Sequence, residues 1–321
     1  MSLIKKSLQI PLLVLPKAAK ERLMRVGSYY LEIFSGQFAD HKSIGKASVF
    51  IERFREIVSD PLNLLIERMP NAGYIDENRN VILHNGVRVP FLGDGSYYGR
   101  FSEILIINRG VHEPLEEFCF QELLKHLKKN KNTTHTMLEL GAYWGHYSLW
   151  FGKELKKTNL TLVEPEKENI QAGRRNFKEN EQEALFINDF VSKDGFTVDA
   201  FLSENMTEDF ELTLLHSDIQ GFEEEMLLNS EKALSEKRIK YLMISTHGDS
   251  IHKNCLSIIQ RHNYLVSVNS DFRHHTTSSD GFIFAHRADC DEIIYCKEVF
   301  GRSEIAEKTP SETLVYLSEL R

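Results

Sequence analysis

A glycine-rich turn is the first place in this chain where the residue types could do chemistry. The sequence from 139 to 148 is Glu-Leu-Gly-Ala-Tyr-Trp-Gly-His-Tyr-Ser, and it follows a short apolar run. Gly141 and Gly145 stand four positions apart, which lets the backbone turn sharply and approach a ligand closely. The free amides at the start of the following helix suit a carboxylate or a phosphate. The turn is therefore a candidate ligand-binding segment.

An acidic residue ends the next apolar run, as Leu162-Val163-Glu164-Pro165. A carboxylate at this place can accept two hydrogen bonds from the ribose diol of an adenosine-type cofactor. The turn is not the dinucleotide fingerprint G-x-G-x-x-G, because Tyr143 stands where the middle glycine would be. It is not a phosphate loop either, because no Gly-Lys-Ser/Thr follows. The alternative is a tight turn with an incidental acid nearby.

Polar residues follow two later apolar runs and are candidates for the acceptor side of a reaction. His216, Asp218 and Gln220 follow the run 212–215, and His247 follows the run 241–244. Because the carboxyl ends of parallel strands lie along one edge of a sheet, we expect Asp218 and His247 to lie together near the turn. We predict that His247 is a general base oriented by Asp218, although the two roles could be exchanged. A hydrogen-bonded structural histidine is the alternative.

A metal site is the competing interpretation of these residues. Asp218 and His247, with His216 or Asp280, would supply oxygen and nitrogen ligands to a divalent ion, which would lower the pKa of an acceptor hydroxyl. The spacing is not specific for a metal, so a divalent metal is not favoured and none is predicted.

Strands and helices alternate from residue 136 onward. Short runs that are apolar on both faces, separated by helical segments, are typical of a parallel sheet covered on both sides. We predict a doubly wound, mostly parallel, seven-stranded α/β sheet with strands at 136–140, 160–163, 184–187, 212–215, 241–244, 265–268 and 282–285.

The residues before this region predict a mixed helical and β-hairpin region. We expect helices over 18–34, 61–69 and 114–129 and a strand over 103–108. In the segment 81–89, Asn85-Gly86 is typical of the type I′ turn of a hairpin. Glu116 is interpreted as an acid that stabilises the positive end of its helix.

Two further groups of residues concern the substrate. Tyr97, Tyr98, Arg100, Trp144 and Tyr147 could line a pocket for a polar ring, although aromatic residues more often belong to the core. The polar loop 271–281 precedes the last predicted strand, and we interpret it as a cover over the acceptor.

The motifs resemble those of S-adenosylmethionine-dependent methyltransferases, and most closely the FkbM-type family. The resemblance spans about residues 110–287 and includes Gly110-Val-His-Glu-Pro114, the turn, Val163-Glu164-Pro165 and His216-Ser-Asp-Ile-Gln-Gly-Phe-Glu223. It implies a Rossmann-like methyltransferase fold, S-adenosyl-L-methionine as cofactor, and cofactor contacts from Glu139, Gly141, Gly145 and Glu164. Asp218 matches the acid after the family's fourth strand. This chain departs from the family with Glu139 in place of the more frequent Asp and with Gln220 where Glu is frequent.

The resemblance implies O-methylation of a hydroxyl acceptor, often on a saccharide or secondary metabolite, and we expect a small molecule or glycan. The alternatives are a nicotinamide-dependent reductase, which the residue at Tyr143 disfavours, and a non-catalytic binding module that keeps the fold. We expect residues 1–110 to form an N-terminal region, 111–290 the cofactor-binding domain and 291–321 a C-terminal extension. The sequence leaves the oligomeric state open.

Composition and charge limit the kinds of partner and the location that we expect for this chain. The net charge of −8 argues against a nucleic-acid partner, and no apolar run of about eighteen residues predicts a transmembrane helix. Four cysteines without a CxxC pair indicate a reducing, cytoplasmic location. Residues 1–25 are basic, and we expect them to pack on their own domain, with weak contact to a membrane surface as the alternative.

Overall fold

The computed structural model describes residues 49–91, 102–205, 207, 210–271, 277, 280–294, 299 and 301–320. The predictions for segment 1–25, helix 18–34 and residues Tyr97, Tyr98 and Arg100 lie outside these ranges. Only four residues of the polar loop 271–281 lie inside them. No helix among the described residues is long and apolar enough to cross a membrane.

One seven-stranded sheet forms the centre of the molecule, in the order β5-β4-β3-β6-β7-β9-β8. Strand β9 runs antiparallel to both of its neighbours, and the pairs from β5 to β7 are all parallel. The predicted doubly wound, mostly parallel sheet of seven strands is therefore confirmed, and the fold is Rossmann-like. The strands are β3 (His135–Leu140), β4 (Thr158–Val163), β5 (Leu185–Ile187), β6 (Leu212–Ser217), β7 (Ile239–Thr246), β8 (Tyr264–Ser270) and β9 (Gly281–Arg287).

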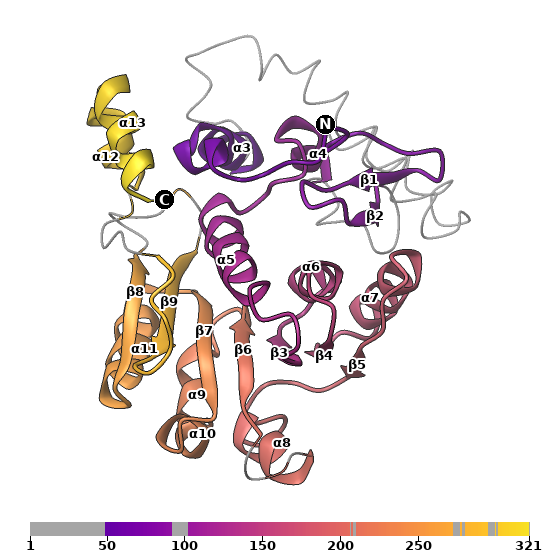
Figure 1. Ribbon diagram of the computed structural model, residues 1–321, viewed down its shortest axis with the longest axis vertical. Coiled ribbons are helices and arrows are strands. Elements are labelled where there is room, and N and C mark those ends of the chain that lie inside the picture. The colour runs from indigo at the N-terminus through magenta and orange to yellow at the C-terminus, as the bar shows by residue number, and fades with distance from the viewer. Residues whose placement is uncertain are drawn as a thin grey trace, which may run out of the picture.

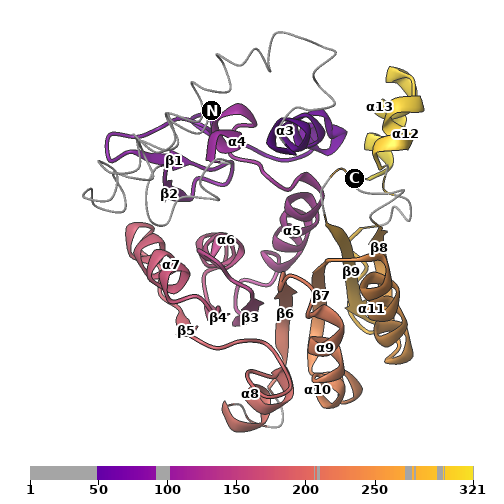
Figure 2. The ribbon, with the colours of Figure 1, turned by 180° about the vertical axis from the view of Figure 1, so that it is seen from behind.

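Successive side chains of each strand enter two different hydrophobic clusters, one on each face of the sheet. Met137 and Met243 belong to the first cluster, and their neighbours Leu138 and Leu242 belong to the second. This alternation follows from the two-residue period of a strand. The first face carries α5 (Pro114–Leu127), α6 (His146–Glu154) and α7 (Lys167–Glu179), and the second carries α8 (Val198–Asn205), α9 (Glu223–Leu228), α10 (Glu231–Ser235) and α11 (Asp249–Arg261) (Figures 1 and 2).

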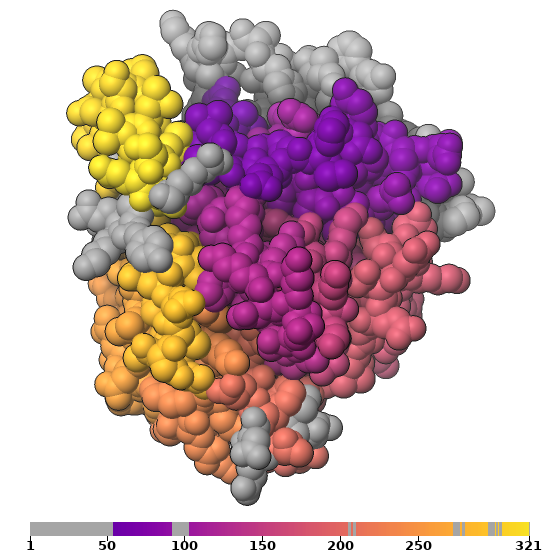
Figure 3. All heavy atoms as spheres, in the orientation of Figure 1, coloured from indigo at the N-terminus to yellow at the C-terminus, as the bar shows by residue number. Residues whose placement is uncertain are grey.

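A further layer, formed by residues before 108, lies over α5, α6 and α7 (Figures 1 and 2). It contains α3 (Val49–Ser59), the 3₁₀ helix Pro61–Leu64, the hairpin strands β1 (Asn80–Ile82) and β2 (Arg88–Pro90), and α4 (Ser102–Ile107). Figure 3 shows its indigo residues resting on the magenta helices. The helices α12 (Arg302–Glu307) and α13 (Pro310–Glu319) end the described chain.

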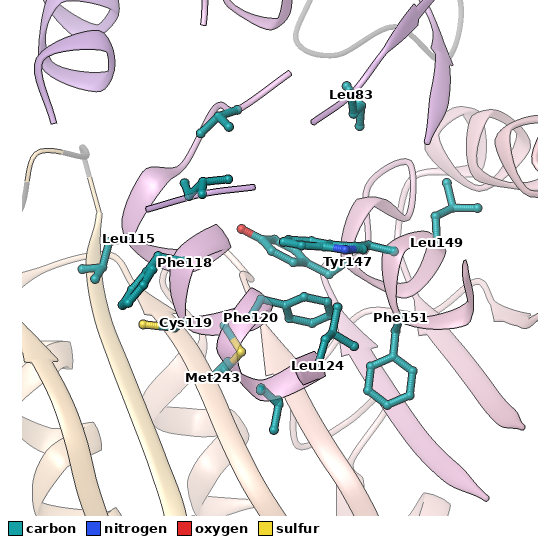
Figure 4. Close-up of a cluster of buried hydrophobic side chains, with 14 of the residues drawn as sticks. Leu83, Leu115, Phe118, Cys119, Phe120, Leu124, Tyr147, Leu149, Phe151 and Met243 are labelled. Carbon is teal, nitrogen blue, oxygen red and sulfur yellow. The ribbon is translucent and has the colours of Figure 1, made fainter. Parts of the chain in front are cut away.

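The first hydrophobic cluster connects this layer with the sheet. It includes Leu83 of the hairpin, Phe120 of α5 and Leu317 of α13, all buried. Figure 4 shows Leu83 across from Tyr147 and Leu149 of α6. Helix α5 is covered on both sides, so its polar residues Glu116 and Glu117 are buried together with its apolar ones. Glu116 does lie in the first turn of α5, as predicted, and it is buried there.

Three local predictions in the N-terminal region are wrong. The predicted strand 103–108 is helix α4, because a short apolar run fits either structure and here only Ile104 and Leu105 face the core. The predicted helix 61–69 is limited to one 3₁₀ turn. The hairpin is present, but Gly86 alone of Asn85-Gly86 has a positive φ, which is not a type I′ turn.

Candidate active site

A cavity of about 430 Å³ opens at the carboxyl ends of β3, β4, β5 and β6. This is the edge at which ligands of open α/β sheets bind. The segments after these four strands and the residue before β9 line it: Gly141, Tyr143, Glu164, Pro165, Glu166, Asn169, Phe190, Val191, Asp218, Ile219, Gln220, Phe222 and Asp280. Of the six residues singled out as site residues, Gly141, Glu164 and Asp218 line this cavity.

Glu164 is held at the cavity wall by donors on both sides of its carboxylate. The backbone N–H of Tyr143 donates to Oε2 at 2.9 Å, and the side-chain amide of Asn169 donates to Oε1 at 2.9 Å. The side chain is buried apart from its cavity edge. The backbone N–H of Glu166 also donates to Oε1 at 3.1 Å, so Oε2 is the oxygen that keeps an acceptor site for a hydroxyl of a ligand.

Gly141 and Gly145 both have positive φ, but different neighbours exclude a side chain at each position. A side chain at Gly141 would collide with the carbonyl oxygen of Asp218, so the turn after β3 closes directly on the segment after β6. A side chain at Gly145 would collide with Phe177 and Leu162. Gly145 therefore faces the packing beneath α7 and is not among the residues that line the cavity.

Glu139 lies in β3, away from the cavity. Its carboxylate accepts the backbone N–H of Ser148 at 3.0 Å, which ties the strand to the first turn of α6. Burial raises the pKa of Glu139 above its usual range, although the neighbouring His216 opposes this. The structure thus places Glu139 behind the turn, where it supports the turn's geometry.

His247 lies between three carboxylates. Its Nδ1 is 2.8 Å from Oε1 of Glu223, and its Nε2 is 3.4 Å from an oxygen of Asp218 and 3.4 Å from one of Asp280. Burial alone would lower the pKa of His247, but the Glu223 hydrogen bond and the charges of Asp218 and Asp280 raise it to about 9. The imidazole is therefore protonated at neutral pH.

Asp218 connects the cavity with His247. Gln220 donates to Oδ1 of Asp218 at 3.0 Å. Burial, together with the charges of Glu113 and Glu116, raises the pKa of Asp218 to about 7, while His247 lowers it. The structure confirms the prediction that these strand ends bring Asp218 near His247. Of the two side chains, Asp218 is the one that lines the cavity.

A second acidic group lies deeper, behind Asp218. The hydroxyl of Tyr147 is 3.0 Å from Glu113 and 3.1 Å from Glu116, and Ser245 donates to Glu116. Burial raises the pKa of Glu116 to about 7. The ring of His216 lies tilted against that of Tyr147, with centroids 4.3 Å apart, and its Nε2 lies 3.6 Å from Glu116. His216 therefore belongs to this group and does not join His247. Tyr147 is buried here and Trp144 is buried in the core, so neither lines the cavity.

Several site residues were not predicted from the sequence. Glu223 is fully buried and holds His247, although it is the last residue of the motif that begins at His216. Phe190 and Phe222 line the cavity, and their rings meet edge-on with centroids 4.7 Å apart. Their unusual exposure for phenylalanine is visible only in the fold, since sequence periodicity gives no sign of it.

One comparison with known proteins matches a segment of this chain to a family model. Residues 119–204 match the family model of the methyltransferase small domain. The matched segment contains the glycine turn, Glu164 and Asn169. A search of curated proteins found no match.

Solved structures with a similar arrangement are methyltransferases of several kinds. One is a precorrin-6y C5,15-methyltransferase from Geobacter metallireducens, with 13% identity over 53% of this chain and 87% of the other, at a TM-score of 0.37. Another is TrmK of M. capricolum with S-adenosyl-homocysteine, with 12% identity over 61% and 80% at a TM-score of 0.37. A third is the N-terminal domain of human METTL16 with the same ligand, with 13% identity over 54% and 70% at a TM-score of 0.39.

Proposed function

We propose that this protein is an S-adenosylmethionine-dependent O-methyltransferase of the FkbM type that acts on a hydroxyl of a saccharide or glycan. One observation carries the proposal: Glu164 and Asp218 line the same cavity, so a ribose-binding acid and an acceptor-side acid face one ligand space. The match of residues 119–204 to a methyltransferase model supports it independently. We also propose that 111–290 is the cofactor-binding unit, with 1–110 and 291–321 as additions.

The cavity residues fit the cofactor part by part. The Glu164 carboxylate would receive a ribose hydroxyl at Oε2. Gly141 lets the turn after β3 close on the carbonyl of Asp218, which brings the turn and Asp218 to one ligand space. Phe190 and Phe222 offer apolar faces for the adenine ring. A volume of about 430 Å³ is within the range of cofactor sites. When bound, the sulfonium supplies an already activated methyl group.

The remaining chemistry is proton removal from the acceptor hydroxyl. Because the imidazole of His247 carries its proton at neutral pH, we assign the base to Asp218, whose pKa of about 7 suits it to accept a proton. This is the exchanged form of the roles predicted from the sequence. His247 then acts as a positioning residue, because its positive charge holds Asp218 and Asp280 at the cavity wall.

The charge of the acceptor side argues for an uncharged, hydroxyl-rich acceptor. Asp218 and Asp280 line the cavity, Glu113 and Glu116 lie behind them, and the whole chain has a net charge of −8. A phosphate backbone would meet repulsion here, whereas sugar hydroxyls donate to carboxylates. We therefore propose a hydroxyl of a neutral glycan, in preference to RNA, as the acceptor.

Cofactor binding tests the first half of the proposal. We expect Glu164→Gln to weaken S-adenosylmethionine binding by about tenfold to a hundredfold, since hydrogen bonds to a charged group are worth about 1.5–3 kcal/mol. Isothermal calorimetry measures the affinity, and thermal unfolding without ligand checks that the variant folds. Glu168→Ala removes an exposed acid of α7 outside the cavity and should bind like the parent. Equal affinity of Glu164→Gln and the parent would refute the assignment.

Methyl transfer tests the second half. With a labelled methyl donor, we expect base-stable label in neutral glycans, because methyl ethers resist the mild base that cleaves methyl esters. Asp218→Asn should lower the rate by about 10²- to 10⁴-fold, the contribution of a general base. Asp194→Asn, at an exposed site outside the cavity, is the control. Label found in RNA instead would overturn the acceptor class.

A further inference from the structure

A buried group of metal-ligand type lies outside the proposed active site, where the hairpin meets helices α5 and α6. His84 comes from the hairpin turn, Glu117 from α5 and His146 from the first turn of α6. One ligand atom of each lies within 4.8 Å of the others, and all three residues are buried. None of them lines the 430 Å³ cavity.

His146 shows that the group is incomplete as it stands. It is 5% exposed, and neither of its ring nitrogens has a hydrogen-bond partner. A neutral imidazole carries one N–H and one lone pair, and here neither has a partner. A buried polar side chain without partners is costly. A bound cation would use this lone pair.

The contact between His84 and Glu117 points the same way. Nε2 of His84 lies 2.9 Å from Oε2 of Glu117, yet neither atom is in hydrogen-bond geometry with a partner. Nδ1 of His84 lies 3.3 Å from the carbonyl oxygen of Glu67. When this Nδ1 carries the proton, the lone pair of Nε2 faces a carboxylate oxygen. In that tautomer the contact is repulsive, and either a second proton on His84 or a cation bound to both atoms relieves it.

The surroundings resemble the outer shell of a metal site. Ligating histidines usually donate their second ring N–H to a carbonyl or carboxylate, as His84 can to Glu67. The other oxygen of Glu117 accepts the backbone N–H groups of His112 and Glu113 at 2.9 and 3.2 Å. This leaves Oε2 as the oxygen available to an ion. A separate cavity of about 180 Å³ is lined by His84 and Trp150, so it reaches one of the three residues.

We propose that His84, Glu117 and His146 bind one divalent transition-metal ion of the zinc class. Two imidazoles and a carboxylate are a ligand set that Zn²⁺ takes, whereas Mg²⁺ and Ca²⁺ require mostly oxygen ligands. Tetrahedral zinc with bonds of about 2.0–2.1 Å needs modest inward movement of these side chains. The ion joins the hairpin to α5 and α6. The inference does not depend on the proposed methyltransferase activity.

Metal content of the full-length, untagged protein tests this inference. After growth with zinc and gel filtration, we expect about one zinc ion per chain by elemental analysis. The chelated apoprotein should regain that content and a higher melting temperature when zinc is added, and cobalt should give the visible absorption of a tetrahedral site. These measurements do not require methyl transfer, so their failure is distinguishable from failure of the proposed function.

Matched histidine variants make the test decisive. His146→Ala and Glu117→Gln should each lower the zinc affinity at least tenfold and abolish the melting shift. His252→Ala is the control, because His252 is equally buried but has hydrogen-bond partners on both ring nitrogens, Thr246 and Asn269. That variant should be less stable and still bind zinc. Zinc-free parent protein that does not take up the ion, or equal zinc content in His146→Ala, would overturn the proposal.

Discussion

The carboxylate of Asp218 and the imidazole of His247 set the pH range in which the proposed reaction can run. Asp218 must lose its proton to act as base, and its pKa is about 7. His247 must keep its proton to hold the carboxylates, and its pKa is about 9. We therefore expect kcat/KM for the acceptor to rise through pH 7 and to fall through pH 9, as a bell-shaped profile.

Two variants assign the limbs of this profile. Asp218→Asn should remove the rising limb along with most of the activity. Glu223→Gln replaces the charged partner of His247 and should move the falling limb to lower pH, while its oxygen still accepts the N–H of Gly221. A falling limb at the same pH in Glu223→Gln would contradict the role of His247 as a charged positioning residue.

At this scale the sequence predicts which residues meet, but not what each one does. Parallel strands bring their carboxyl ends to one edge, so the approach of Asp218 and His247 follows from strand order alone. The protonation of His247 depends on Glu223 and Asp280, which arrive from α9 and from the residue before β9. Tertiary packing fixes where the side chains of Glu223 and Asp280 lie, and sequence spacing carries no information about that packing.

Among the elements, prediction succeeds where one pattern repeats. The seven strands alternate with helices, and each strand is apolar on both faces because helices cover the sheet on both sides. The segment 103–108 is a single short apolar run that does not belong to this repeating pattern. The run fits a strand or a helix equally, and the choice of helix α4 comes from contact of Ile104 and Leu105 with the core.

Polar residues inside α5 show a second limit of pattern reasoning. A helix with acids in its first turn usually exposes them to solvent, where they favour the helix dipole. In this protein Glu116 is buried against the sheet and α6, where it contacts Ser245 and Tyr147. Glu117 is buried against the hairpin layer, where it contacts His84, so the two acids enter different polar groups. The sequence before 110 gives no measure of how closely that layer packs, and so the buried groups could not be predicted.

For the molecule as a whole, the shared hydrophobic cluster predicts that the hairpin layer and the sheet unfold together. Leu83 of the hairpin and both tryptophans, Trp144 and Trp150, belong to the same cluster. Truncating a fully buried leucine costs about 2–5 kcal/mol. We expect Leu83→Ala to lower the free energy of unfolding by that amount in urea, with tryptophan fluorescence and circular dichroism giving one coincident transition.

The control for Leu83→Ala is Leu64→Ala, a truncation of an exposed leucine in the same layer. Leu64 is 70% exposed, so its truncation should change the free energy of unfolding by no more than about 0.5 kcal/mol. Trp150 lies against His84 of the hairpin turn, with ring centroids 4.5 Å apart, so the fluorescence is followed in a Trp150→Phe background. In that background Trp144, in the turn before α6, reports on the sheet and its helices. If the two layers were independent, the fluorescence midpoint of Leu83→Ala would equal that of the parent while circular dichroism showed an earlier, separate step. A shifted fluorescence midpoint instead means that a residue of the hairpin stabilises the helices that carry the glycine turn.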